Sequence, residues 1–189
     1  MKKILSIIIL GLIITSKGMA YEEANYKVVK KNEIYEIRKY SDRLAIETDI
    51  SNQGSSFRKL FNYISGNNRD NEEIKMTTPV TQMEKKGNMT MQFYLPSKFN
   101  KENIPVPSNS DVKILNIKSG YYAAIIYSGR TSDKNFIKHK SILENELKKD
   151  DILILSVPIK ATYDGPFTLP MNRRNEVMFE INIENKGEI

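Results

Sequence analysis

Alternation of apolar and polar residues with a period of two runs through much of this chain, and it indicates half-buried β-strands. The alternating segments are residues 34–38, 44–50, 74–83 and 89–95 in the first part of the chain, and 112–117, 122–127, 152–161 and 176–183 in the second. Each part therefore supplies two strands, then an interval without this alternation, then two more strands.

The first interval has the periodicity of an amphipathic helix. Four apolar residues follow the spacing i, i+3, i+4 and i+7: Phe57, Leu60, Phe61 and Ile64. Ser55 or Ser56 is the predicted N-cap and Gly66 the predicted stop, because a serine hydroxyl accepts from free helix N–H groups and glycine tolerates the left-handed conformation that follows a helix.

The second interval predicts a longer helix over 133–149. Ser132 is its predicted N-cap, and Lys148 and Lys149 in its last turn suit the negative end of the helix dipole. An inward stripe is expected from four residues, Phe136, His139, Leu143 and Leu147.

The two parts match each other when the sequence is shifted by 79 residues. The shift places Ala45 and Ile46 on Ala124 and Ile125, Phe57 on Phe136, Ile64 on Leu143, Pro79 on Pro158 and Val80 on Ile159. We therefore predict an internal duplication of β-β-α-β-β units, at about residues 26–95 and 111–183. The predicted fold is α+β: a distorted, open antiparallel barrel with two amphipathic helices and pseudo-twofold symmetry, with a ligand groove between the halves.

Proline positions refine this expectation. Pro79 and Pro158 fall inside the predicted strands 74–83 and 152–161, where a proline removes one hydrogen-bond donor from the ladder. Both are expected at a sheet edge or a bulge.

Residues 1–20 have the pattern of a secretory signal peptide. Lys2 and Lys3 precede an apolar run over residues 4–14, and Gly18 and Ala20 suit cleavage after Ala20. An uncleaved anchor is the alternative, but that run is shorter than the roughly 20 residues needed to span a bilayer. We expect a single exported domain, residues 21–189, without a stable membrane anchor, in the periplasm of a bacterium or secreted from it.

Charge and composition exclude several function classes. Removing the three lysines of the leader reduces 29 basic residues to 26 against 23 acidic ones, so the net charge falls from +6 to +3 without a long basic cluster. This balance does not favour nucleic-acid binding. The chain has no cysteine, one histidine and no recognisable nucleophile, phosphate-loop or metal-ligand motif, so we predict a protein that is not an enzyme.

Five motifs in order resemble the SOUL haem-binding family. They are Tyr35-Glu36-Ile37-Arg38-Lys39-Tyr40, Phe57-Arg58-Lys59-Leu60, Tyr63-Ile64-Ser65-Gly66-Asn67, Ile74-Lys75-Met76-Thr77-Thr78-Pro79-Val80-Thr81 and Asn172-Arg173-Arg174-Asn175-Glu176-Val177. The resemblance covers about residues 26–183. It implies a distorted barrel of two similar halves and binding of haem or another tetrapyrrole in a shallow apolar groove.

One departure from the family pattern concerns the iron. The axial histidine proposed for one family member falls where this chain has Lys39, and a protonated lysine is a poor iron ligand. If haem binds, the resemblance therefore implies binding without that ligand.

Candidate ligand-contacting residues fall into two groups. The apolar groove wall is predicted from Phe57, Leu60, Phe61, Tyr35 and Met76, and the cations that can meet haem propionates are Arg38, Lys39, Arg173 and Arg174. Each group has an alternative reading, because the apolar residues would also pack an ordinary core and the cations would also form structural ion pairs.

His139, the only histidine, is a third kind of candidate. Its imidazole can ligate iron, whereas the alternative is a histidine in the core or groove wall with one hydrogen bond, which we favour. The methionines can ligate haem iron or Cu(I), but their scattered spacing favours core packing.

Two functions of different kinds follow. The first is an exported binder of haem or related tetrapyrroles that acts as a carrier, scavenger or buffer. The second is a binding module for a non-haem amphipathic effector or a protein partner. The sequence gives no indication of the oligomeric state.

Overall fold

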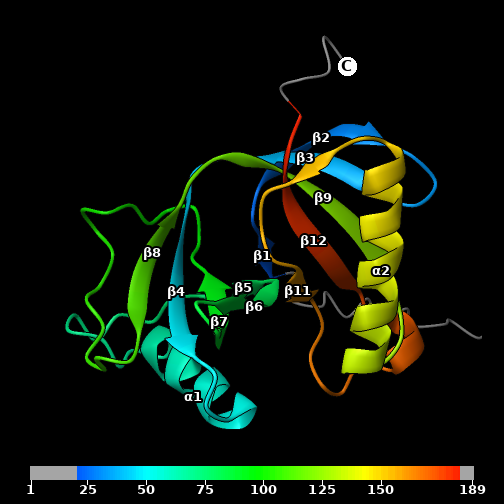
Figure 1. Ribbon diagram of the computed structural model, residues 1–189. Coiled ribbons are helices and arrows are strands. Elements are labelled where there is room, and N and C mark those ends of the chain that lie inside the picture. Colours follow the sequence, from blue (N-terminus) through cyan, green and yellow to red (C-terminus); the bar gives the residue numbers. More distant parts are fainter. Residues whose placement is uncertain (1–20, 184–189) are drawn as a thin grey trace, which may run out of the picture.

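The computed structural model describes residues 21–183, so the predicted signal peptide lies outside the described residues (Figure 1). The helices are α1 (Gln53–Ile64), α2 (Asp133–Lys149) and the short 3-10 helix η1 (Pro170–Asn172). The strands are β1 (Glu22–Glu23), β2 (Tyr26–Lys31), β3 (Glu36–Tyr40), β4 (Arg43–Asp49), β5 (Thr77–Thr78), β6 (Val80–Lys85), β7 (Asn88–Tyr94), β8 (Lys113–Ile117), β9 (Gly120–Tyr127), β10 (Leu153–Ile154), β11 (Ile159–Thr162) and β12 (Asn175–Asn182).

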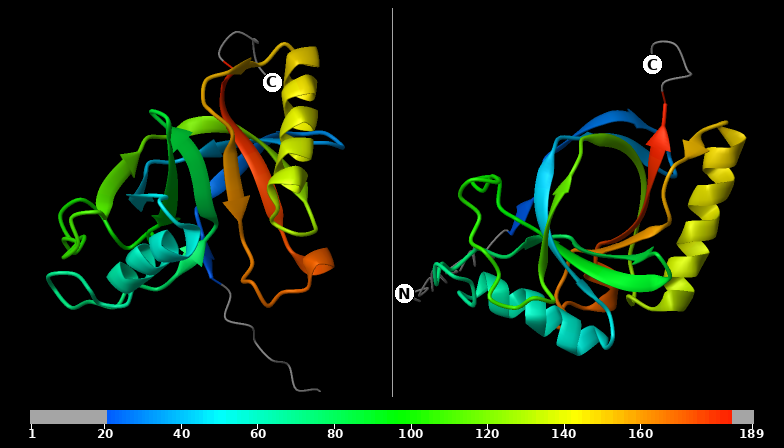
Figure 2. Two further views of the ribbon diagram at one scale, coloured as in Figure 1. Left: turned by 60° about the horizontal axis from the view of Figure 1, so that its bottom comes forward. Right: turned by 60° about the vertical axis from the view of Figure 1, so that its left-hand side comes forward.

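The main sheet is antiparallel and curls into an open half-barrel, with both helices outside it (Figure 2). Its strand order is β2-β3-β9-β12-β11-β6-β7-β4-β8, and β10 pairs with the C-terminal end of β12. The predicted α+β class and open antiparallel barrel are confirmed.

The order of strands from β3 to β8 is symmetric about its centre. Strand β3 corresponds to β8, β4 to β9, β6 to β11 and β7 to β12, and replacing each strand by its counterpart gives the same order in reverse. The ladder between β6 and β11 lies at the centre, where the halves meet. Such an order is what pseudo-twofold symmetry requires, while the internal duplication itself stays a prediction.

Each helix covers a separate apolar core on the outer face of the sheet. Leu60 and Ile64 of α1 pack with residues of β4 and β7, and Leu143 and Leu147 of α2 pack with residues of β9 and β12. These two cores anchor the helices at a distance from each other (Figure 1). The outer face above the central β6–β11 ladder lies between them.

The predicted α2 is confirmed at both ends, with Ser132 as its N-cap. The predicted start of α1 is wrong by a few residues. Asn52 is its N-cap because its side-chain oxygen accepts from the N–H groups of Gly54 and Ser55, so the helix begins before the serines. Gly66 follows the helix at a φ of 99°, a conformation that suits glycine.

The long predicted strands around the two prolines are also corrected. Pro79 separates β5 from β6, and Pro158 precedes β11, so each predicted strand is divided into two short ones. Neither proline lies within a ladder, which agrees with its missing N–H group. β1 and β2 were not predicted, because the polar segment that contains them has no clear alternation; β1 pairs in parallel with β5.

Candidate functional site

A groove of about 700 Å³ lies on the outer face of the sheet, between α1 and the segment that joins β11 to β12. Its floor includes the central ladder, in which Val80 pairs with Thr162 and Gln82 pairs with Lys160. All four residues line the groove, so the floor is built from both halves of the fold. The groove therefore lies where the sequence predicts a pocket.

One wall of the groove is aromatic and comes from α1. Phe57 and Phe61 stack on each other, with ring centroids 6.0 Å apart and an angle of 14° between the planes. They are 40% and 45% exposed, although they stand on a helix whose Leu60 is fully buried. Phe57 also packs edge-on against Phe93 of the core at 5.1 Å, which holds its ring in place.

Met76 and Met91 extend the apolar lining from this wall to the floor. Met91 is 1% exposed and belongs to the core beneath the groove, whereas Met76 is half-buried. An apolar floor and wall with few polar groups are typical of a small-molecule site.

The opposite wall is polar and comes from residues 162–166 and 173. Arg173 donates from Nε to the carbonyl oxygen of Thr168 at 2.8 Å and from Nη2 to that of Pro166 at 2.6 Å. Lys160 forms an ion pair with Asp133 at 3.1 Å. These two cations are the positive charges on the groove lining.

Four of the predicted site residues thus meet in one place: Phe57, Phe61, Met76 and Arg173. Leu60 does not join them, because it points to the other side of α1 and has no exposed area. The predicted grouping is therefore corrected for Leu60: its spacing indicates the buried stripe of the helix.

Tyr35 and Lys39 also lie elsewhere. The Tyr35 hydroxyl donates to Asp150, at the end of α2, and its ring packs in the core under that helix. Burial and the neighbouring Asp150 raise the pKa of this hydroxyl. The Lys39 ammonium lies 3.9 Å from the ring centroid of Tyr121, with which it is paired across β3 and β9.

Arg38 belongs to a buried ion-pair network on the concave face of the sheet. Its guanidinium, with 0% side-chain exposure, donates to Glu176 at 2.7 Å and to Glu36 at 2.9 Å. Burial lowers the pKa of Arg38, but the hydrogen bonds and charge of Glu176 outweigh it and leave the pKa raised. A guanidinium in this environment is fully engaged and does not face the groove.

Arg174 belongs to the same ion-pair network and lies at its partly exposed edge. It donates to Glu176 at 2.8 Å and to Glu23 at 3.0 Å, and its guanidinium lies 3.7 Å from the ring centroid of Tyr163. For Arg38 and Arg174 the structure thus shows the ion pairs of the alternative reading.

His139 lies on α2, outside the groove lining. Its ring stacks on Tyr127 with centroids 4.0 Å apart, and its Nδ1 is 2.8 Å from the carbonyl oxygen of Asn135. This is the histidine with one hydrogen bond that the alternative reading describes. Among the described residues that line the groove there is no histidine.

Sequence reasoning missed the polar residues of the groove floor and opposite wall, Lys160, Thr162 and Tyr163. The first two follow Pro158 on a short strand that the long predicted strand obscured. Alternation on β11 places Lys160 and Thr162 on the face opposite to Ile159 and Ala161, and that signal was available once the strand start was known.

Comparison with known proteins fits this architecture. The family model described as SOUL heme-binding protein matches residues 21–180. The chain belongs to the SOUL heme-binding family. Heme-binding protein 2 of Mus musculus is 29% identical over 170 residues, which cover 80% of this chain and 82% of the mouse protein. Heme-binding protein 2 of Homo sapiens is 29% identical over 157 residues, which cover 76% of each chain.

Solved structures of low sequence identity have a similar fold. The C-terminal domain of EcmrR superimposes with a TM-score of 0.60 at 13% identity, over 83% of this chain and 98% of that domain. A hydrolase from Listeria innocua gives a TM-score of 0.56 at 9% identity, over 82% of this chain and 94% of that one. At such identities the likeness concerns the fold alone.

Proposed function

We propose that this SOUL protein binds haem or a related tetrapyrrole in the groove between its halves and acts as a carrier, scavenger or buffer rather than as an enzyme. The observation that carries the proposal is the stacked pair Phe57 and Phe61, which is held exposed over an apolar floor. Two curated relatives named as heme-binding proteins support it.

The residues present fit a porphyrin. A groove of about 700 Å³ is within the range of about 300–1,000 Å³ that small-molecule sites occupy. Aromatic faces stack favourably on a flat apolar ring, and positive charge is supplied by Lys160 of the floor and by Arg173 of the wall opposite to the phenylalanines. A haem in the groove would bring its own redox-active iron, while the protein would supply stacking, burial and charge.

Binding without a histidine ligand is part of the proposal. His139 is held by Tyr127 and Asn135, and Lys39 lies over Tyr121, so neither candidate faces the groove. Tyr163 lines the groove, but its hydroxyl donates to Glu176 and burial raises its pKa, which disfavours a phenolate. The groove therefore favours recognition of the ring over coordination of the metal.

We further propose that the protein is exported, to the periplasm or out of the cell. The pattern of residues 1–20 supports export. Within residues 21–183, no helix combines the length and the apolar character that crossing a bilayer requires.

The test is a titration with hemin, followed by the Soret band, of the wild type, Phe57→Ala and His139→Ala. We expect one haem per chain, an affinity weakened about tenfold by Phe57→Ala through lost aromatic contact, and an unchanged spectrum with His139→Ala. Leu155→Ala is the matched control, because Leu155 is 55% exposed but lies outside the groove lining.

Two outcomes would contradict the proposal. A changed Soret spectrum in His139→Ala would make His139 an axial ligand. Binding that does not saturate, or that Phe57→Ala and Leu155→Ala weaken equally, would reject the groove as a haem site. The second candidate, a non-haem amphipathic effector or a protein partner, is favoured by the groove's lack of a histidine, and a metal-free flat aromatic ligand competing equally with hemin would support it.

A further inference from the structure

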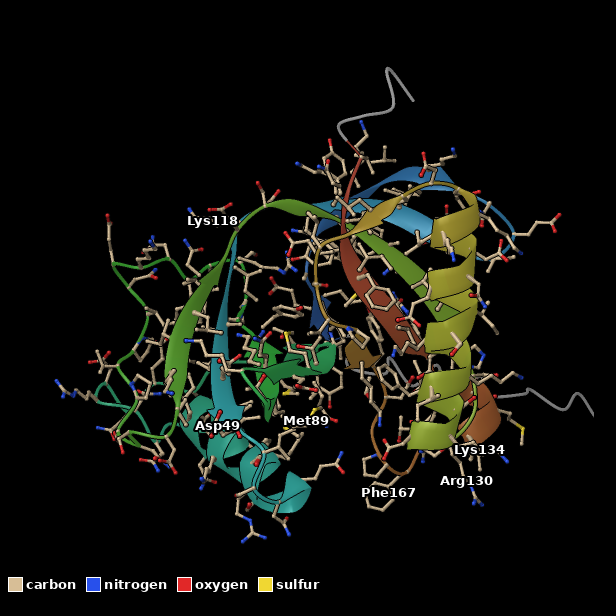
Figure 3. All side chains as sticks on the ribbon, in the orientation of Figure 1. Asp49, Met89, Lys118, Arg130, Lys134 and Phe167 are labelled. Atoms are coloured by element: carbon tan, nitrogen blue, oxygen red, sulfur yellow. The ribbon has the colours of Figure 1, made fainter. Side chains whose placement is uncertain are left out.

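A strongly apolar tip projects from the segment that joins β11 to β12, residues 163–173, which we term the apical loop. Phe167 is 99% exposed, Met171 is 72% exposed and Leu169 is 59% exposed. Figure 3 shows Phe167 at the lower end of the molecule, pointing away from the fold. Three large apolar side chains on one short loop are a cluster, which is unlike the scattered apolar residues of an ordinary surface.

The fold holds this loop with its apolar side chains outward. Arg173 donates to the carbonyl oxygens of Pro166 and Thr168, the residues on either side of Phe167, at 2.6 and 2.8 Å. The N–H of Thr168 donates to the carbonyl oxygen of Gly165 at 3.2 Å, and the N–H of Gly129 donates to that of Pro170 at 2.8 Å. The exposure of Phe167 is therefore built into the backbone.

Positive charge surrounds the apical loop. The loop and the neighbouring segment 128–138 together contain Arg130, Lys134, Lys138 and Arg173 against Asp133 and Asp164. Arg130 and Lys134 are exposed and lie at the same end of the molecule as Phe167 (Figure 3).

The two carboxylates of this surface are already engaged. Asp133 pairs with Lys160 at 3.1 Å, and Asp164 accepts from the N–H of Arg174 at 2.6 Å. Since the four cations of these segments outnumber the two carboxylates, the surface around the tip carries a net positive charge.

We infer that the apical loop docks reversibly on the surface of an anionic lipid bilayer. Aromatic and aliphatic side chains enter the interfacial region, while lysine and arginine beside them meet the headgroups. A narrow protruding tip suits this partner, because lipids close around it on all sides. A folded protein would need about 800 Å² on each side for a stable interface, which such a tip does not offer.

The location gives docking a consequence for the groove. Gly165, Pro166 and Arg173 belong to the apical loop and also line the groove, so a docked loop places the groove beside the membrane surface. An apolar ligand dissolved in the bilayer would then reach the groove by a short path.

The test is sedimentation of the protein, without haem, with vesicles of equimolar phosphatidylglycerol and phosphatidylcholine. We expect Phe167→Ser to weaken the partition about tenfold or more, since the variant loses the phenylalanine side chain that docking would bury in the bilayer interface. The double variant Arg130→Gln/Lys134→Gln should weaken the partition by about tenfold as well, because each basic residue near an anionic surface contributes to the binding free energy. Leu155→Ser removes an apolar residue that is 55% exposed but lies outside the apical loop, and it should leave the partition unchanged.

Three outcomes would overturn the inference. The first is equal partition of wild type and Phe167→Ser. The second is equal binding to pure phosphatidylcholine, which would remove the role of charge. The third is a loss of hemin affinity in Phe167→Ser with an unchanged vesicle partition, which would make the loop a cover for the groove. Because the vesicle assay contains no haem, its result is independent of the proposed haem site.

Discussion

The two faces of the main sheet differ in what they bury and what they expose. The concave face buries charge: Arg38 and Glu176, both with 0% side-chain exposure, form an ion pair at 2.7 Å between strands that lie 138 residues apart. The outer face leaves apolar area open, with Phe57 and Phe61 exposed above the β6–β11 ladder. The concave face thus holds a buried ion pair beside its own apolar cluster, whereas part of the outer face, between the two helix-covered cores, leaves aromatic side chains exposed to solvent.

Glu176 explains how the concave face remains stable. Its carboxylate accepts from the guanidinium groups of Arg38 and Arg174 and from the hydroxyl of Tyr163. Buried charges persist when they are paired and hydrogen-bonded on every side. The family motifs that contain Arg38 and Glu176 are therefore joined by a buried ion pair between the first part of the chain and the last.

Removing the buried cation should have the largest effect. Arg38→Met leaves the carboxylates of Glu176 and Glu36 without their main partner, so we expect the free energy of unfolding to fall by about 3–5 kcal/mol in urea denaturation. Hemin affinity of the folded variant should be unchanged, because Arg38 does not line the groove.

Lys118→Met is the matched control, since it removes a cation from the exposed ion pair with Asp42. It should leave the denaturation midpoint unchanged. If Arg38→Met were no more damaging than this control, the concave network would not be a structural element.

Sequence patterns predicted the fold better than the site for a physical reason. Periodicity reports which side of an element is buried, and it correctly placed α2, the order of strands around both helices and the open barrel. It also ranked Leu60 with Phe57 and Phe61, because all three are apolar and fall on nearby helix positions. Only the packing shows that Leu60 faces the core and the phenylalanines face the groove.

Charged residues were harder to place than apolar ones. Arg38 and Arg173 have the same side chain and lie in comparable motifs, yet one is buried against Glu176 and the other supports the apical loop. Partners far apart in sequence determine that difference, and a single sequence contains no signal for them. The apical loop was missed because its apolar residues have no strand or helix period.

The two sides of α1 provide the next contrast. Leu60→Ala opens a cavity in a fully buried site, so we expect a loss of about 2–5 kcal/mol in the free energy of unfolding. Phe61→Ala, at a position 45% exposed, should cost less than about 1 kcal/mol but weaken hemin binding. Urea denaturation and hemin titration of both variants check this separation, and equal losses of stability would refute it.

Acid should weaken the ion-pair network on the concave face. Burial opposes ionisation of Glu36, but hydrogen bonds from Lys31 and Arg38 outweigh it and hold its pKa below the ordinary value of 4.5. A lowered pKa in the folded state means that stability is present above 4.5 and is lost as the pH falls below it. When the pH is lowered from neutral to below 4.5, the urea midpoint should therefore fall less for Glu36→Gln than for the wild type. Parallel curves would exclude Glu36 as a source of the acid dependence.

The smallest effect is expected under α2, where the outer face is closed instead of open. Tyr127 stacks on His139, and its hydroxyl is buried without a hydrogen-bond partner among the described residues. Burial raises the pKa of this hydroxyl to about 12, so stability is present below the ordinary value of 10.0 and is lost as the pH rises towards 12. Tyr127→Phe keeps the stack and removes the hydroxyl, and it should leave stability at neutral pH within about 1 kcal/mol of the wild type and lessen its loss in alkali.

Tyr63→Phe is the matched comparison for Tyr127→Phe, because the buried hydroxyl of Tyr63 donates to the carbonyl oxygen of Pro105 at 2.8 Å. Removing the hydroxyl leaves that oxygen without this donor, so we expect the free energy of unfolding to fall by about 1 kcal/mol in thermal or urea unfolding. If Tyr127→Phe lost as much stability as Tyr63→Phe, the Tyr127 hydroxyl would have a partner of equal strength. The closed α2 face would then depend on polar contacts, as the concave face does, and not on packing.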